Sequence, residues 1–229
     1  MAMNREQLRS EVRENIKRTA TAFADTRIDT HLDWAQERIA DLHTFEEMRV
    51  SDTFSTTDSV KNYSFPERMK DIFSMALQDG GSSRKLSYVP AREFDLKVPR
   101  TQTYSTGIPS CYVDYGTSFD LFKTPDDIYV VNRRFSQYPR SLSTDTMVSD
   151  LVRKDKIIVA GATSFGFWAL REVEDAEYWD SIIFAKLMME AVATDHSAVD
   201  WNPIARGFRA RGIGYGGEYW KSPFVRRFP

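Results

Sequence analysis

The fold is decided by residues 155–197, which read DKIIVAGATSFGFWALREVEDAEYWDSIIFAKLMMEAVATDHS. This stretch predicts two helices, Asp155 to about Glu172 and Asp175 to about Ser197. The first is apolar on nearly every side, so protein must cover it all round, and we infer that one copy of the chain cannot supply that cover alone. The second has one apolar face: Tyr178, Ile182, Ala185, Met189 and Val192.

Two further helices are predicted near the N-terminus. Asp29 or Thr30 is expected to cap the second of them. We predict that the N- and C-terminal helix pairs pack as one bundle. The apolar positions at helical spacing are Leu8, Val12, Ile16, Ala20 and Phe23 in the first, and Leu32, Ala35, Ile39 and Leu42 in the second.

Between the helix pairs, short apolar runs alternate with turn residues, which is typical of strands. We predict a hairpin of Thr53–Thr57 and Val60–Phe65, and a second of Met69–Gln78 and Lys85–Val89 around a glycine turn. Arg92–Thr106 is expected to be a loop or a short helix. Further strands are predicted at Ser110–Tyr115, Ser118–Phe122 and Ile128–Phe135, the last two joined through a Pro125 turn.

The fold class expected is therefore α+β, a helical bundle with a small antiparallel β region inserted and an extended C-terminal arm. The predicted divisions are the N-terminal helix pair (1–50), the inserted β region (51–142), the C-terminal helix pair (143–199) and the arm (200–229).

The net charge of −2 hides an asymmetry along the 229 residues. From Trp201 to the end there are six basic residues and one acidic residue, Glu218, so this segment has a net charge of +5. The rest of the chain contains 25 basic and 32 acidic residues, a net charge of −7. A single cysteine, Cys111, excludes an intrachain disulfide. No signal peptide is recognisable and the longest apolar run is shorter than a membrane span, so we expect synthesis and folding in the cytoplasm.

No residue pattern predicts catalysis, a cofactor or a metal ion. His31, His43 and His196 lack ligand spacing and are expected to be solvated or capping, while Asp126 and Asp127 are interpreted as turn residues. Ser164 lacks a nucleophile elbow. The glycine-rich run 212–217 lacks the strand and helix that a dinucleotide loop requires. We therefore do not expect an enzyme.

The arm mixes arginines with aromatic residues, a composition unusual for a disordered tail. Such a segment binds either protein, through interface anchors, or single-stranded nucleic acid, through phosphate contacts and stacking. The protein interpretation is favoured because the net charge is modest for a DNA-binding arm. The candidate partner-binding residues are Arg206, Phe208, Arg209, Arg211, Tyr215, Tyr219, Trp220, Phe224, Arg226 and Arg227.

The layout between about residues 4 and 199 resembles the head-to-tail adaptor (connector) proteins of tailed bacteriophages. The resemblance lies in the order and spacing of several short motifs between two helix pairs. These are Tyr63-Ser64-Phe65-Pro66, Gly107-x-Pro109-x-x-Tyr112, Leu121, Pro125-x-Asp127-x-Tyr129, Tyr138-Pro139, Leu142 and the Tyr178-Trp179 pair.

The resemblance implies a structural virion protein that forms a ring, usually of twelve copies, between the portal and the tail tube or nozzle. Its expected partners are other copies of itself, the portal protein, the tail protein and the double-stranded DNA that passes through, with no membrane and no cofactor. The expected location is the head-tail joint of the virion, after assembly in the host cytoplasm. The alternative is a nucleic-acid-binding protein that uses the arm, and an enzyme is the least supported class.

Overall fold

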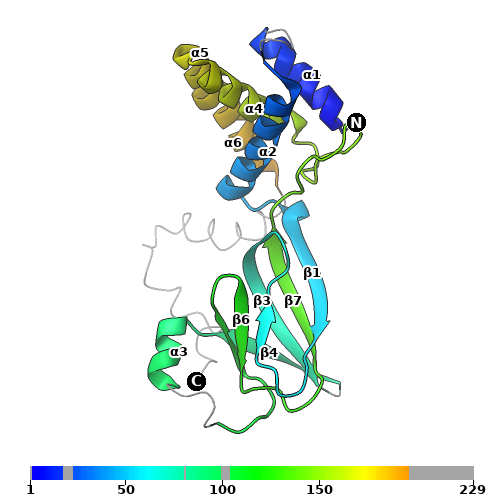
Figure 1. The fold of residues 1–229 in the computed structure, drawn as a ribbon, viewed down its shortest axis with the longest axis vertical. Coiled ribbons are helices and arrows are strands. Elements are labelled where there is room, and N and C mark those ends of the chain that lie inside the picture. Colours follow the sequence, from blue (N-terminus) through cyan, green and yellow to red (C-terminus); the bar gives the residue numbers. More distant parts are fainter. Residues whose placement is uncertain (1, 18–22, 80, 99–103, 196–229) are drawn as a thin grey trace, which may run out of the picture. The chain divides into compact units, whose positions relative to one another are not determined.

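The computed structural model describes residues 2–17, 23–79, 81–98 and 104–195 (Figure 1). The chain divides into two compact units. The sheet unit consists of residues 1–6 and 36–153, and the helical unit consists of residues 7–35 and 154–229. The predicted boundaries at residues 50, 142 and 199 stay predictions.

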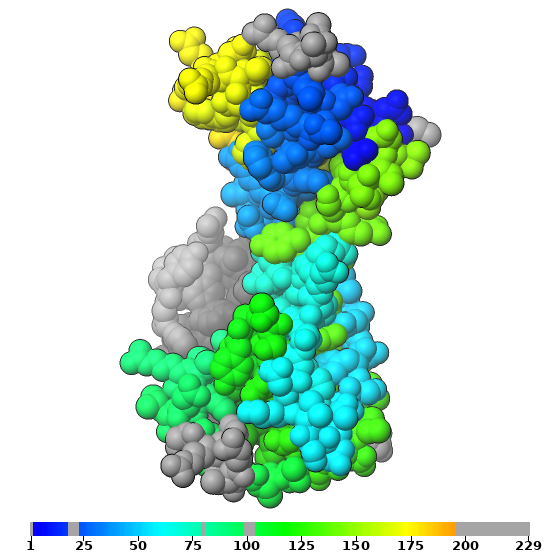
Figure 2. Space-filling view, in the orientation of Figure 1, coloured from blue at the N-terminus to red at the C-terminus, as the bar shows by residue number. Residues whose placement is uncertain are grey.

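The sheet unit is built on one seven-stranded sheet, in the order β1-β7-β3-β4-β5-β6-β2. Segments far apart in sequence therefore lie side by side, and in Figure 2 side chains from cyan and green parts of the chain share one surface. A short helix, α3 (Ala91–Lys97), follows β4. The strands are β1 (Arg49–Ser55), β2 (Asn62–Ser64), β3 (Met69–Asp79), β4 (Ser82–Tyr88), β5 (Cys111–Asp114), β6 (Ser118–Phe122) and β7 (Val130–Gln137).

Strand β4 changes partner at its last two residues. Its first part pairs with β3 in antiparallel fashion, from Asp79↔Ser82 to Met75↔Leu86. Its end pairs with β5 in parallel, at Ser87↔Cys111 and Tyr88↔Tyr112. All the other paired neighbours in the sheet are antiparallel, so this change joins two antiparallel groups into one mixed sheet.

The core of the sheet unit is apolar and aromatic. Phe119 on β6 is fully buried, and its ring lies 4.8 Å from that of Phe65 and 5.7 Å from that of Phe54, centroid to centroid. Aromatic pairs at these distances add to the free energy of burial. The other fully or nearly buried members are Met75, Leu77, Leu86, Tyr112, Leu121, Tyr129 and Val131.

The helical unit is arranged around α4 (Asp155–Leu170). A Cβ on Gly161 would lie 3.1 Å from the Cβ of Ala35 and 3.3 Å from the ring of Phe184, so glycine permits the close approach of two other helices. Asn15 donates a hydrogen bond to Thr163 Oγ1 over 3.3 Å. The remaining elements are α1 (Arg5–Ile16), α2 (Asp25–Leu42), α5 (Val173–Glu177), the π-helical η3 (Tyr178–Phe184) and α6 (Ala185–Thr194); α1 and α2 each extend into the sheet unit.

The predicted fold class is wrong. The β region is a seven-stranded mixed sheet, preceded by the 3-10 turn η1 (Glu46–Met48), and it forms a major part of the fold where a small antiparallel insertion was expected. The hairpin predicted from Thr53 to Phe65 is also wrong, because β1 and β2 lie at opposite edges of the sheet. The β3–β4 hairpin is confirmed. The strands β6 and β7 are consecutive in the chain, as expected, but they are not neighbours in the sheet.

The inference that one copy cannot cover the apolar helix is wrong for Ile157–Phe167, while Trp168 near the end of the helix is 47% exposed. Within a single chain, nearly every residue of α4 from Ile157 to Phe167 is buried, Phe165 only partly. The sequence pattern could not reveal this, because the cover comes from helices far away in the chain, as the contacts of Gly161 and Thr163 show. Helix α2 also begins at Asp25, one turn before the predicted cap at Asp29 or Thr30.

We predict that Phe119→Ala lowers the free energy of unfolding by about 3–5 kcal/mol, because it removes a buried ring and leaves a cavity. Urea denaturation measures this. The matched control is Ile128→Ala, since Ile128 is 68% exposed, and its effect is expected within about 0.5 kcal/mol. Equal effects of the two substitutions would contradict the core described above.

Candidate interaction surfaces

The predicted partner-binding residues of the arm, from Arg206 to Arg227, lie outside the described residues. Their role therefore stays a prediction.

The histidine prediction is wrong for His31, which is buried between Phe23, Trp34 and Phe165. Burial, and then the charge of Arg27, lowers the pKa of His31 to about 4, so the ring is neutral at pH 7. Within the described ranges, no group of three or more His, Cys, Asp or Glu side chains could hold a metal ion. His196 lies outside those ranges.

The other candidate polar groups make local structural bonds. Ser164 is buried, and its hydroxyl donates to the carbonyl of Ala176 over 3.3 Å. Asp127 accepts a bond from the amide of Ile128, and Asp126 accepts one from the hydroxyl of Tyr129. These two carboxylates are turn residues, as predicted.

An apolar stripe on the last helix faces away from the core of the helical unit. Tyr178, Ile182 and Met189, which belong to the predicted apolar face, are 50%, 53% and 68% exposed, while the residues that face inward are Ala176, Phe184 and Met188. Exposed apolar stripes of this kind mark sites of protein-protein contact. We name Tyr178, Ile182 and Met189 the outer stripe.

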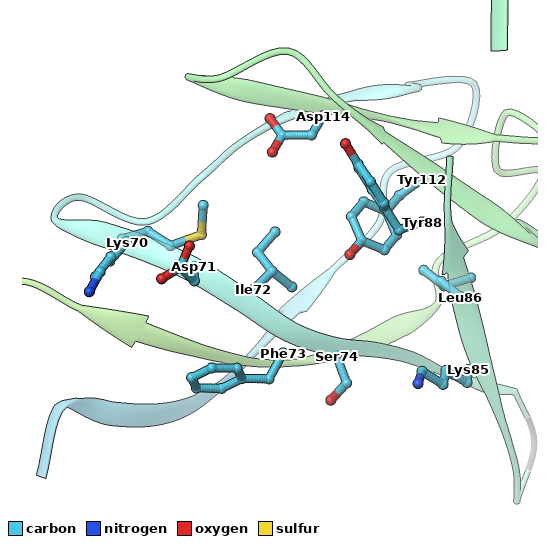
Figure 3. Close-up of a pocket in the computed structure, with 11 residues that line it drawn as sticks. Lys70, Asp71, Ile72, Phe73, Ser74, Lys85, Leu86, Tyr88, Tyr112 and Asp114 are labelled. Atoms are coloured by element: carbon cyan, nitrogen blue, oxygen red, sulfur yellow. The ribbon is translucent and has the colours of Figure 1, made fainter. Parts of the chain in front are cut away.

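A groove opens in the sheet unit where β4 leaves β3 (Figure 3). Its volume is about 330 Å³. Ile72 on β3 points toward Tyr88 on β4 and Tyr112 on β5, whose rings are 5.5 Å apart. The carboxylates of Asp71 and Asp114 also line it. Lys70 and Lys85 line it too, so the groove combines aromatic surface with charged groups of both signs.

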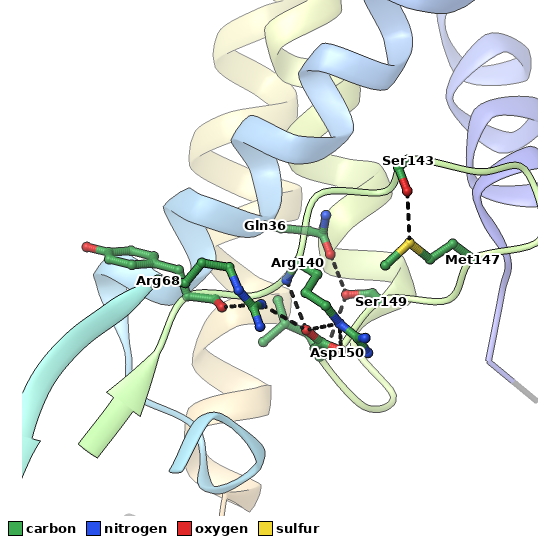
Figure 4. A network of polar contacts seen from close by, with 9 residues as sticks. Gln36, Arg68, Arg140, Ser143, Met147, Ser149 and Asp150 are labelled. Atoms are coloured by element: carbon green, nitrogen blue, oxygen red, sulfur yellow. Dashed lines mark hydrogen bonds and ion pairs between the residues drawn. The ribbon is translucent and has the colours of Figure 1, made fainter. Parts of the chain in front are cut away.

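The segment from Tyr138 to Arg153, after β7, is held by polar contacts within the sheet unit (Figure 4). Asp150 accepts bonds from the backbone N and from Nη2 of Arg140, over 2.9 and 2.7 Å, and a longer contact of 3.5 Å from Arg68. The hydroxyl of Ser149 donates to Gln36 Oε1 over 2.6 Å. Partial burial acts to raise the pKa of Asp150, but the bonds and charge of Arg140, with the charge of Arg68, lower it overall.

Comparison with protein families gives a match to the model of the SU10 adaptor protein over residues 3–200. The chain belongs to the SU10 adaptor protein family. The resemblance to phage head-to-tail adaptors is thereby confirmed. The adaptor is a structural component of a bacteriophage particle, and its family is not a family of enzymes. No curated protein matches the chain.

The motif residues that carry the resemblance stabilise the sheet unit of the adaptor. Phe65 stacks on Phe119, and the hydroxyl of Tyr63 donates to the carbonyl of Val60 over 2.8 Å. Pro109 is buried, and Tyr129 is held by Thr56 and Asp126. Most of these motif residues therefore have a structural role within the sheet unit. Among the described helices of the adaptor, none is both long and apolar enough to cross a bilayer.

Sequence reasoning missed the residues that line the groove. Tyr112 belongs to one of the motifs that carry the resemblance, and the sequence pattern places Asp71, Ile72 and Tyr88 in predicted strands without distinguishing them from their neighbours. The available signal was the mismatch in strand length. Strand β3 has 11 residues and β4 has only 7, so part of the longer strand was bound to lack a partner on that side.

We predict that Asp150→Asn lowers the free energy of unfolding of the adaptor by about 1 kcal/mol at pH 7, since Arg140 loses a charged acceptor. A carboxylate with a lowered pKa stabilises the fold above its unfolded pKa of about 3.9, and this contribution is lost as the pH falls through the folded pKa.

The difference between the wild type and Asp150→Asn should therefore begin to shrink near pH 4 and disappear below the folded pKa. Urea denaturation at several pH values measures it, with the exposed Glu67→Gln as control. A difference that stays constant from pH 7 to pH 3 would contradict the assignment.

Proposed function

We propose that the adaptor forms a ring, of twelve copies as in the proteins that it resembles, between the portal and the tail of the phage particle. The ring seals the joint and lets double-stranded DNA pass. The observation that carries this proposal is the family match over residues 3–200. No chemical reaction is involved, because the task is recognition and sealing.

The outer stripe supports a multi-copy assembly. A single chain leaves Ile182 and Met189 largely exposed, at a cost of roughly 1.5–3 kcal/mol per side chain relative to burial. Contact with another copy removes this apolar surface from water. Since α4 is already covered within one chain, we assign the intersubunit contact to the outer stripe.

The charge distribution supports a division of tasks between body and arm. Residues before Trp201 carry a net charge of −7, and the remainder carries +5. A negative channel wall repels the phosphates of passing DNA, which keeps the duplex from adhering. The positive arm is attracted to acidic surfaces of the portal, with Phe208, Trp220 and Phe224 as anchors and Arg209, Arg211, Arg226 and Arg227 as charged contacts.

Removal of residues 201–229 should leave the described units folded, because the core residues named above all precede Trp201. We expect the truncated adaptor to keep its circular dichroism spectrum and melting temperature. It should fail to join DNA-filled heads to tails, which is measured by electron microscopy and by infectious titre.

A matched variant replaces Arg209, Arg211, Arg226 and Arg227 by alanine and keeps the aromatic anchors. It should reduce joining less than the truncation does. Normal yields of infectious particles with the truncated chain would exclude the arm from this function.

The second candidate function is binding of single-stranded nucleic acid by the arm, favoured by the arginines among its aromatic residues. It predicts an affinity that falls steeply with salt. If all six basic residues contact phosphates, log K against log salt has a slope of about −4. For an adaptor we expect no specific shift in a gel assay at low salt. Tight binding with that slope would favour the second function over the first.

A further inference from the structure

Part of β3 presents an open strand edge in the middle of the sheet. The strand pairs with β7 from Met69 to Gln78 on one side, but on the other it pairs with β4 only from Met75 onward. Within the described residues, no strand covers the second edge of Met69–Ser74. Backbone N–H and C=O groups along such an edge can pair with an extended segment of another chain.

The groove beside this edge has room for side chains of an added strand. Ile72 points into it from β3, and Tyr88 and Tyr112 form the facing wall (Figure 3). Tyr88 is 55% exposed. An apolar or aromatic side chain that enters the groove removes this surface from water and stacks on the tyrosines.

The lining of the groove contains two aspartates, Asp71 and Asp114, and two lysines, Lys70 and Lys85. No ion pair neutralises Asp71 or Asp114 among the described residues. The ammonium group of Lys70 is bound to the carbonyl of Ala40 over 2.6 Å and to Thr44 Oγ1, while Lys85 lies at the other end of the groove from Asp71. The pKa of Tyr112 is raised by burial and then by the charge of Asp114, two residues along the same strand. At the other end of the groove, a basic side chain meets the carboxylate of Asp71, which has no ion pair among the described residues.

One segment of this chain has the matching pattern. Residues 204–211 read IARGFRAR, in which Phe208 and Ala210 alternate with Arg209 and Arg211. In an extended strand, alternate residues lie on opposite faces, so Phe208 and Ala210 share one face, together with Ile204 and Arg206, and Arg209 and Arg211 share the other. It follows the last described residue, Asp195, by nine positions, which in extended form span up to roughly 30 Å.

We propose that residues 204–211 of a second copy add as a strand to the open edge of β3. Phe208 or Ala210 enters the groove beside Ile72, and Arg209 and Arg211, on the other face of the added strand, approach Asp71, which lies on the opposite face of β3 from Ile72. The inference rests on the proposed multi-copy assembly and refines the role of the arm: Phe208, Arg209 and Arg211 contact a neighbouring copy, whereas Trp220, Phe224, Arg226 and Arg227 remain for the portal.

The test uses the full chain with Cys111→Ser, which removes its one cysteine. One form carries Ile72→Cys and a small tag, and the other carries Ala210→Cys and a larger tag. The two forms are assembled together with portal protein and treated with a short bis-maleimide cross-linker. We expect a cross-linked product that contains both tags. With Ile128→Cys in place of Ile72→Cys, the yield should fall at least about fivefold, because Ile128 is exposed but does not line the groove.

Charge reversal provides the second measurement. Asp71→Lys should lower the yield about fivefold, and Arg209→Glu with Arg211→Glu in the other form should restore it. Equal yields from the Ile72 and Ile128 forms would overturn the proposal. A cross-link that forms only within a chain carrying both cysteines would overturn the assignment to a second copy.

The copy number of the assembly, measured by native mass in the same samples, separates the two proposals. Multi-copy assembly without the cross-link removes the strand addition and leaves the adaptor function intact. A monomer in the presence of portal protein contradicts the proposed function itself.

Discussion

The change of partner by β4 is the constraint on which the sheet unit depends. Antiparallel pairing with β3 as far as Leu86 and parallel pairing with β5 from Ser87 onward link two groups of strands that would otherwise be separate sheets. Because β4 leaves β3 to pair with β5, the first part of β3, Met69–Ser74, keeps an unpaired edge on that side. The buried cluster around Phe119 then fills one face with side chains from both groups.

The sequence predicts local structure in this chain better than it predicts pairing. Helices α1 and α4, the β3–β4 hairpin and the turn at Asp126 and Asp127 follow from periodicity and turn chemistry, which act over a few residues. The pairing of β1 with β7 joins residues about 80 positions apart, and no local pattern encodes it. The groove beside β3 depends in part on distant pairing, that of β4 with β5, and the only local indication of it is the unequal length of the two strands of the β3–β4 hairpin.

In the last helix, the sequence pattern identifies apolar residues but does not show which of them are buried. It carries apolar residues on two sides, one with Phe184 and Met188 and the other with Ile182 and Met189. The π-helical turn at Tyr178–Phe184 departs from the 3.6-residue period on which the prediction was based. The side that meets Gly161 is buried. The outer stripe is left for contacts that a single chain does not make, which is expected of a protein that functions within an assembly.

Electron cryomicroscopy of the head-tail joint tests the central claim most directly, namely that surfaces left open in one copy are covered in the assembled particle. We predict several copies of the chain arranged around the DNA channel, with protein density against both the outer stripe and the open edge of β3. A joint that lacks this chain, or a chain in which both surfaces face solvent, would contradict the account.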